Sequence, residues 1–265
     1  MGKIVVSVLS ESRFEFAFTL HQAPQIRLHI QNDPPTFSFF RGKKHVRSSV
    51  LTVKNNCNFA IAPCFQTSSG NQVTTGFELG PGDSNSVDIS ASWSGRVWAR
   101  YGCSNDGETF SCASGDCGSG QVTCNGAGGA PPVTLAEFTI PGSSSTDFYD
   151  VSNVDGFNLP LSITAQGAGC PSTDCSADIN AQCPSDLAVV DGSGTTIGCK
   201  SACLAFNSDQ DCCRGAFATS ETCPPSDKSN FFKALCPMSY SYAFDDSSST
   251  FTCATGDNYD ITFCP

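Results

Sequence analysis

The chain has 265 residues, 17 cysteines and a formal net charge of −11 at pH 7. All three histidines lie before position 50 and every cysteine at position 57 or later, so imidazole-based catalysis is excluded from the body of the chain. Residues 51–265 hold seven basic against 22 acidic side chains, which argues against nucleic acid or an anionic membrane as partner, and their cysteine content indicates an oxidising, extracellular compartment.

The first fifty residues differ from the rest, with seven basic against three acidic side chains. Lys3 precedes a short apolar run, but Ser10, Glu11 and Arg13 interrupt it and no small-residue cleavage motif follows, so this is not a recognisable secretory signal. No stretch approaches the roughly twenty apolar residues of a membrane span. We expect residues 1–50 to be a poorly ordered extension, from a misassigned start or in place of a leader. The alternative is a basic tail that binds an anionic partner.

From residue 51 the sequence consists of short extended runs separated by glycine and proline turns. Residues 96–101 alternate strictly, so Arg96, Trp98 and Arg100 should share one face of a strand. In the run 134–140 the alternation puts Glu137 on the polar side. Extended runs are expected at 51–56, 71–79, 86–90, 96–101, 134–140, 147–165 and 259–265. This pattern predicts a mainly β fold, a sandwich or barrel formed by residues 51–169 and 237–265.

Residues 170–236 have a different character, because nine cysteines fall within them and strand alternation disappears. Ser226 can cap a short helix over 226–236, in which Phe231, Phe232 and Leu235 form an apolar stripe. A weaker helix is expected at 200–206. The segment predicts a disulfide-rich lobe that is held together by covalent bonds because it lacks an adequate core.

The stretch GETFSCASGDCGSGQVTC (107–124) could be a metal site or a set of disulfides. Zinc sites need histidine or closely spaced thiolate pairs, and the sequence has no C-x-x-C pair and no histidine near a cysteine. Disulfides are therefore predicted, with no metal and no cofactor. Asp116 is expected to order the loop by accepting hydrogen bonds from backbone amides.

Several segments together carry a specific resemblance: CASGDCGSGQVTC (112–124), GRVWARYGC (95–103), PPVTLAEFTIP (131–141), FYDVSNVDGFNLPL (148–161), CCRG (212–215), FFKALCPMSYSYAFDD (231–246) and ITFCP (261–265). They resemble the thaumatin-like proteins, the pathogenesis-related thaumatin type, over nearly all of 51–265. Ser114 and Glu108 depart from the usual threonine and glycine of the family signature. The resemblance implies a thaumatin-like antiparallel β-sandwich with a disulfide-rich lobe and eight disulfides.

The family's pattern also implies which cysteines are paired. The implied disulfides are Cys57–Cys264, Cys103–Cys112, Cys117–Cys124, Cys170–Cys253, Cys175–Cys236, Cys183–Cys199, Cys203–Cys212 and Cys213–Cys223. Cys64 is left over, and we expect it to be a buried free thiol in a strand, with an intermolecular bridge as the alternative.

Many thaumatin-like proteins have an acidic cleft between the sandwich and the lobe, and the resemblance carries its residues over to this chain as Arg96, Glu137, Asp150, Asp155 and Asp245. Arg100 is the alternative arginine, and Trp98 and either Tyr240 or Tyr242 could stack on sugar rings. Glycoside hydrolysis needs a protonated carboxyl and a second carboxylate, and clustered acids raise one another's pKa. We expect Glu137 to be the general acid and Asp150 or Asp155 the base or nucleophile.

Each of these residues also has a structural interpretation. Asp155 precedes Gly156, a common turn pair; Asp245 could lie in a solvated loop; Glu137 could simply face solvent. Only the presence of all five residue types of the family's cleft favours a functional interpretation over these structural ones. The resemblance implies a secreted monomer that binds β-1,3-glucan in the cell wall and hydrolyses it as a glucan endo-1,3-β-glucosidase. The alternatives are a non-catalytic glucan-binding or antifungal protein and an inhibitor or sweet-taste protein, of which the acidic set disfavours the last.

Overall fold

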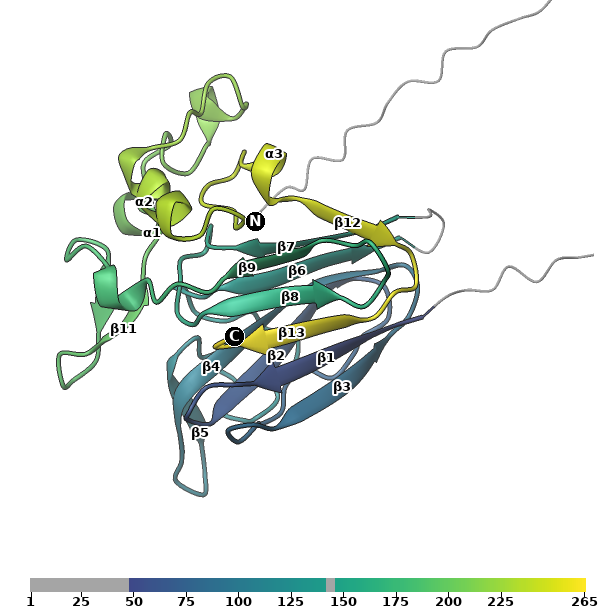
Figure 1. The fold of residues 1–265 in the computed structure, drawn as a ribbon. Coiled ribbons are helices and arrows are strands. Elements are labelled where there is room, and N and C mark those ends of the chain that lie inside the picture. Colours follow the sequence, from purple (N-terminus) through teal and green to yellow (C-terminus); the bar gives the residue numbers. More distant parts are fainter. Residues whose placement is uncertain (1–47, 142–145) are drawn as a thin grey trace, which may run out of the picture. The chain divides into compact units, whose positions relative to one another are not determined.

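The computed structural model describes residues 48–141 and 146–265, and shows two β-sheets lying face to face (Figure 1). The five-stranded sheet has the order β3-β1-β13-β8-β9. Its strands are β1 (Ser49–Asn55), β3 (Ser84–Ile89), β8 (Leu161–Ala165), β9 (Ser172–Cys175) and β13 (Tyr259–Phe263). The six-stranded sheet has the order β12-β7-β6-β4-β2, with β5 paired to β4. Its strands are β2 (Ile61–Ser69), β4 (Trp93–Asn105), β5 (Phe110–Ser114), β6 (Leu135–Ile140), β7 (Thr146–Ser152) and β12 (Phe251–Ala254).

The main core fills the space between the two sheets, as the alternation predicts. Val97, Ala136 and Val151 point inward from neighbouring strands of one sheet, and Leu51 and Ile261 from the other, and all five are fully buried. The rings of Phe138 and Tyr149 lie 5.3 and 5.1 Å from that of Tyr259, so aromatic packing joins the sheets. The mainly β sandwich is therefore confirmed.

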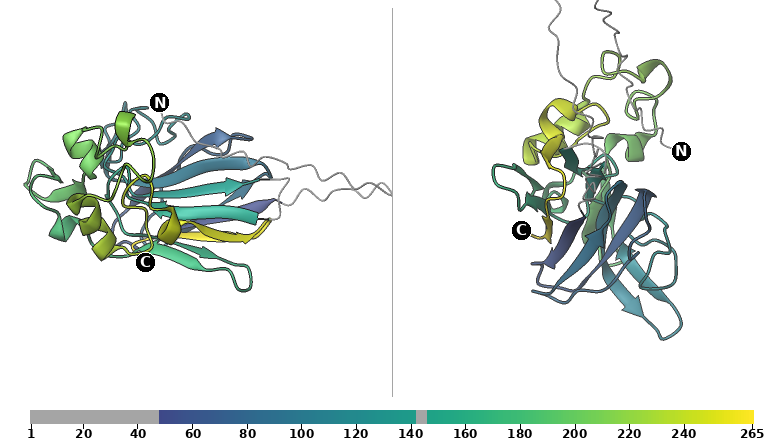
Figure 2. Two further views of the ribbon diagram at one scale, coloured as in Figure 1. Left: turned by 90° about the horizontal axis from the view of Figure 1, so that it is seen from above. Right: turned by 90° about the vertical axis from the view of Figure 1, so that its right-hand side faces the viewer.

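The lobe gathers at one end of the strands (Figure 2). It contains η1 (Asn180–Gln182), the hairpin of β10 (Ala188–Val190) and β11 (Thr196–Cys199), α1 (Ala202–Phe206), η2 (Gly215–Phe217) and α2 (Asp227–Leu235). Both predicted helices are confirmed as α1 and α2. The hydroxyls of Ser201 and Ser226 cap their N-termini. The hairpin was not predicted, and β9 pairs with β8 in the sandwich although it lies within the segment expected to form the lobe.

All eight disulfides implied by the resemblance are present, and Cys64 is a buried free cysteine. Cys57–Cys264 joins the residue that lies two positions after β1 to the residue after β13, across 207 positions of sequence. Asp116 acts as predicted, because its carboxylate accepts hydrogen bonds from the amides of Cys112 at 2.8 Å and Gly118 at 2.6 Å.

Some expectations differ from the structure or fall outside it. The run 71–79 forms no strand and contributes only a single bridge, between Leu79 and Ile61, whereas the preceding segment 61–69 forms β2. The predicted extension lies outside the described residues up to position 47, while Ser49 and Val50 already belong to β1. Within the described ranges, no helix is long and apolar enough to cross a membrane.

Candidate functional site

Three charged residues lie side by side across the outer face of the six-stranded sheet. In the antiparallel register Arg96 of β4 is opposite Glu137 of β6, and Glu137 is opposite Asp150 of β7. Directly paired residues project to the same face, with their Cβ atoms about 4.5–5.5 Å apart. Because Val97, Ala136 and Val151 fill the core on the other face, these charged residues must point away from it. The alternation predicted for 96–101 and 134–140 thus creates this arrangement.

Asp155 joins the three residues from the turn that follows β7. The amide of Gly156 donates to the carbonyl of Asn153 at 2.9 Å, and Gly156 has φ +81°, a conformation that glycine adopts readily. Asp155 is therefore a turn residue, as the pair with Gly156 predicts, but its side chain also faces the site. Its Oδ2 lies 3.2 Å from Nη1 of Arg96, in a half-exposed ion pair.

The segment after α2 completes the site. The amide of Asn153 donates to the carbonyl of Tyr240 at 2.8 Å, and the amide of Tyr240 to the carbonyl of Val151 at 2.9 Å. These bonds hold the segment against the end of β7. The Tyr240 hydroxyl donates to Oδ1 of Asp246, the first residue of α3 (Asp246–Ser249), at 2.8 Å.

Asp245, which the resemblance places in the site, has its carboxylate fully engaged elsewhere. It accepts hydrogen bonds from the amide and hydroxyl of Ser241 at 3.0 and 2.8 Å, and from the Ser248 hydroxyl at 3.1 Å. Lys233 Nζ forms an ion pair with it at 3.0 Å, and the residue is buried. The carboxylate that is exposed and acts on Asp150 belongs to Asp246. The resemblance carries over Asp245 alone, and the fold shows that its neighbour Asp246 is the exposed carboxylate.

Arg100 is on the same strand face as Arg96, as expected, yet the structure rules it out as a ligand contact. It is fully buried, and its guanidinium donates to the backbone carbonyls of Ala62 and Gln121, each at 3.2 Å, and to that of Val122. The loop between β5 and β6 covers this end of the face. Trp98 is likewise fully buried and donates through its indole nitrogen to the carbonyl of Gly115 at 3.0 Å, so it cannot stack on a sugar.

Glu137, Asp150, Asp155, Asp246 and Arg96 are called the acid row from here on. Burial raises the pKa of Glu137, Arg96 opposes this rise, and Asp155 adds to it. Burial also holds the pKa of Asp150 well above its ordinary value, with further contributions from the charges of Glu137 and Asp246. Asp150 Oδ1 is buried without a hydrogen-bond partner. Two adjacent carboxyl groups in this environment do not ionise together, so the pair retains a proton under mildly acidic conditions.

This electrostatic arrangement predicts how stability depends on pH. Groups with a raised pKa keep protons in the folded chain that the unfolded chain releases, so the free energy of unfolding falls as pH rises above about 4. Asp150→Asn removes one such group. We expect the variant to be more stable than the wild type at pH 7 and to lose less stability between pH 4.5 and 7 in denaturant titrations. The exposed control Asp88→Asn should follow the wild type; an Asp150→Asn curve parallel to both would contradict the assignment.

A pocket between lobe and sandwich residues has none of the five acid-row residues in its lining. Val154, Ser241 and Tyr242 line one side of it, and the lobe residues Ser201 and Cys213 lie on another. Val154 precedes Asp155, and Ser241 binds Asp245. The hollow at this junction is therefore separate from the acid row, and Val154 connects the two only along the chain.

Comparison with known proteins identifies the family. The Thaumatin family model matches residues 55–265. Thaumatin-like protein 1 of Pyrus pyrifolia is 52% identical over 225 residues, which cover 83% of this chain and 92% of that protein. A Prunus avium protein named glucan endo-1,3-beta-glucosidase is 49% identical over 223 residues, covering 82% of this chain and 91% of that protein.

Among solved structures, a laminaripentaose-producing beta-1,3-glucanase in complex with laminaritetraose aligns with a TM-score of 0.56 at 14% identity, covering 83% of this chain and 99% of that one. At this identity the likeness concerns the fold alone. The family model and the sequence relatives lead to one conclusion. The chain belongs to the thaumatin family.

Proposed function

We propose that the chain is a secreted glucan endo-1,3-β-glucosidase that binds β-1,3-glucan along the acid row and hydrolyses it as a monomer. The observation that carries the proposal is the direct cross-strand pairing of Glu137 with Asp150, next to the ion pair of Arg96 and Asp155. The relative from Prunus avium, named as an enzyme of this class, supports the choice of substrate.

The roles follow from the surroundings of each carboxyl group. Glycoside hydrolysis requires one carboxylic acid that protonates the leaving oxygen and one carboxylate that activates water or attacks the sugar. Glu137 supplies the acid, because burial and its acidic neighbours favour its protonated form. Asp155 has a cation 3.2 Å away and suits the base or nucleophile better than Asp150, which contacts no cation within the described structure. Asp150 instead helps to keep a proton on its pair with Glu137.

Arg96 and Tyr240 are proposed to contact the substrate. Arg96 is half-exposed, so its remaining donors can reach sugar hydroxyls, and the partly exposed Tyr240 ring lies beside Asp246. Asp245, which the resemblance places in this set, instead fixes the segment that carries Tyr240.

The test is product release by the full chain, purified from an oxidising secretory host. Reducing ends should be released from soluble β-1,3-glucan at pH 5, and a soluble β-1,4-glucan should give none. Binding is measured in parallel by retention on insoluble β-1,3-glucan. Absence of both binding and product would overturn the proposal.

Binding without product over a day at pH 4 to 6 would replace the enzyme with the second candidate, a non-catalytic glucan-binding or antifungal defence protein. One observation favours this candidate: the carboxylate of Asp245, which the resemblance places in the site, is bound by Lys233, Ser241 and Ser248 instead of being available to a substrate.

A further inference from the structure

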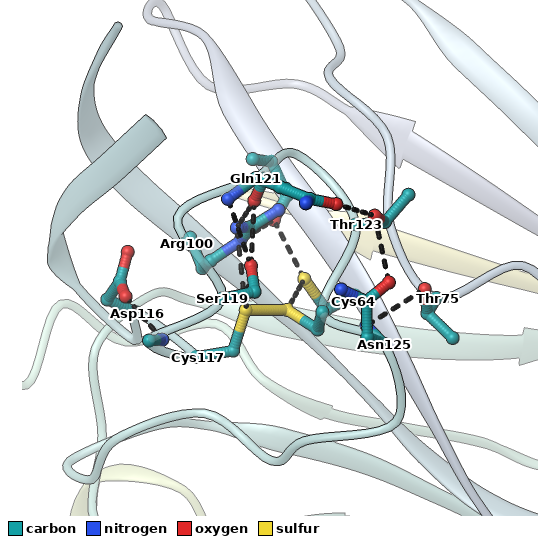
Figure 3. The surroundings of a disulfide bond; sticks show 12 residues. Cys64, Thr75, Arg100, Asp116, Cys117, Ser119, Gln121, Thr123 and Asn125 are labelled. Carbon is teal, nitrogen blue, oxygen red and sulfur yellow. Dashed lines mark hydrogen bonds between the residues drawn. A yellow bond between two sulfur atoms is a disulfide. The ribbon is translucent and has the colours of Figure 1, made fainter. Parts of the chain in front are cut away.

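Cys64, the cysteine outside the disulfide framework, lies on the outer face of β2 opposite Trp98. It is fully buried beneath the loop that contains the Cys117–Cys124 disulfide. Gly76 closes the space from another side, since a Cβ atom there would lie 3.3 Å from the Cys64 sulfur. The thiol is thus enclosed by the loop and its neighbours, and Figure 3 shows it beside the disulfide.

The three sulfur atoms are close enough to react with one another. Cys64 Sγ lies 2.8 Å from Cys124 Sγ, and all three sulfurs are within 4.8 Å of each other. Cys124 is therefore in reach of two possible partners, Cys117 and Cys64. Two of the sulfurs are already joined in a disulfide, so the group is not a ready set of three thiolate ligands for a metal.

The surroundings treat the two candidate free thiols differently. Cys64 is fully buried, whereas Cys117 is half-buried on a surface loop. Nη1 of Arg100 lies 3.6 Å from Cys117 Sγ, and a guanidinium at this distance stabilises a thiolate. Asp116, the acidic group beside them, is turned toward the amides of Cys112 and Gly118.

We propose that Cys64, Cys117 and Cys124 form a thiol–disulfide exchange site, in which Cys64 displaces Cys117 from Cys124. The Cys64 thiol loses its proton and its sulfur forms a bond with Cys124. The Cys117–Cys124 bond breaks, and Cys117 leaves as a thiolate that takes up the proton. The number of disulfides is unchanged and no oxidant is consumed. The exchange moves the free thiol from the interior to the loop, where Cys117 becomes a site for modification by thiol-reactive compounds.

The rate should depend steeply on pH. Burial raises the pKa of the Cys64 thiol to about 12; the Arg100 charge lowers it and the Asp116 charge raises it. Only the thiolate attacks, so the rate follows the thiolate fraction. At pH values below the pKa, this fraction increases about tenfold for each unit by which the pH is raised. Exchange is therefore slow at neutral pH and accelerates in alkaline solution.

The experiment incubates the folded full chain with iodoacetamide at pH 7, 8 and 9 without reductant. Acid then stops exchange and the excess iodoacetamide is removed. The chain is unfolded at about pH 5, the remaining thiols are labelled with a maleimide, which reacts at that pH, and peptides are mapped by mass spectrometry. We expect the first label on Cys117, together with a Cys64–Cys124 crosslink. After correction for the pH dependence of the reagent itself, the rate of labelling should increase about tenfold per pH unit. The rate should also be independent of protein concentration, because the exchange is intramolecular.

The control variants are Cys64→Ser and Cys64→Ala, two replacements of different polarity in case one does not fold. Neither should place label on Cys117. Second label on Cys64 alone, with Cys117–Cys124 intact at every pH, would overturn the proposal. So would equal labelling of Cys117 in the variants, since the Cys117–Cys124 bond would then open by a route that does not involve Cys64, such as attack by hydroxide.

Discussion

Glu137→Gln is expected to reduce the release of reducing ends from β-1,3-glucan by about 10² to 10⁴-fold, the range typical for loss of a general acid. Glutamine keeps the shape and hydrogen-bonding capacity of the side chain but cannot deliver a proton to the leaving oxygen. Retention on insoluble glucan should therefore change little. Both quantities are measured on the full chain at pH 5.

The matched control is Glu221→Gln, an exposed glutamate in the lobe, which should retain wild-type hydrolysis. If Glu137→Gln hydrolyses glucan at the wild-type rate, Glu137 is not the acid. If it loses binding as well as turnover, the residue holds the substrate instead. Either result would require a different assignment of roles within the acid row.

Removal of Cys57–Cys264 by a double alanine substitution is expected to destabilise the chain by about 5 kcal/mol, against about 2.5 kcal/mol for removal of Cys203–Cys212. The two disulfides close loops with sequence separations of 207 and 9, and the longer loop restricts the unfolded chain more. Denaturant unfolding without reductant measures both values. Equal losses, or a larger loss for the lobe disulfide, would contradict this loop-length argument.

The sandwich could be predicted because its strands bury one face each, which leaves period-two alternation in the sequence. β2 was not predicted, because its sequence lacks this alternation. Its first five residues, Ile61 to Phe65, are all buried, because the core covers one side and the loop bearing Cys117 and Cys124 covers the other. Alternation then vanishes, as it does in strands buried on both faces. The run 71–79 alternates more clearly yet pairs at only one position.

The sequence predicts which strand face carries the candidate site, but not which of the side chains on that face are exposed. Alternation places Arg96 and Arg100 on one side of β4, yet only the covering loop decides that Arg100 is buried among backbone carbonyls. Likewise, the sequence has two adjacent aspartates, and the ion pair with Lys233 of α2 decides that Asp245 is the buried one. Such choices depend on tertiary contacts that no local pattern records.

In the proposed mechanism, carboxyl groups alone carry out catalysis, with a proton retained between Glu137 and Asp150. The pH dependence of glucan hydrolysis by the wild-type full chain is the most direct test of this mechanism. The rate should be highest between about pH 4 and 6 and should fall as the pH rises toward 8, because the pair with raised pKa loses its proton. A rate that stays constant or increases up to pH 8 would contradict this mechanism.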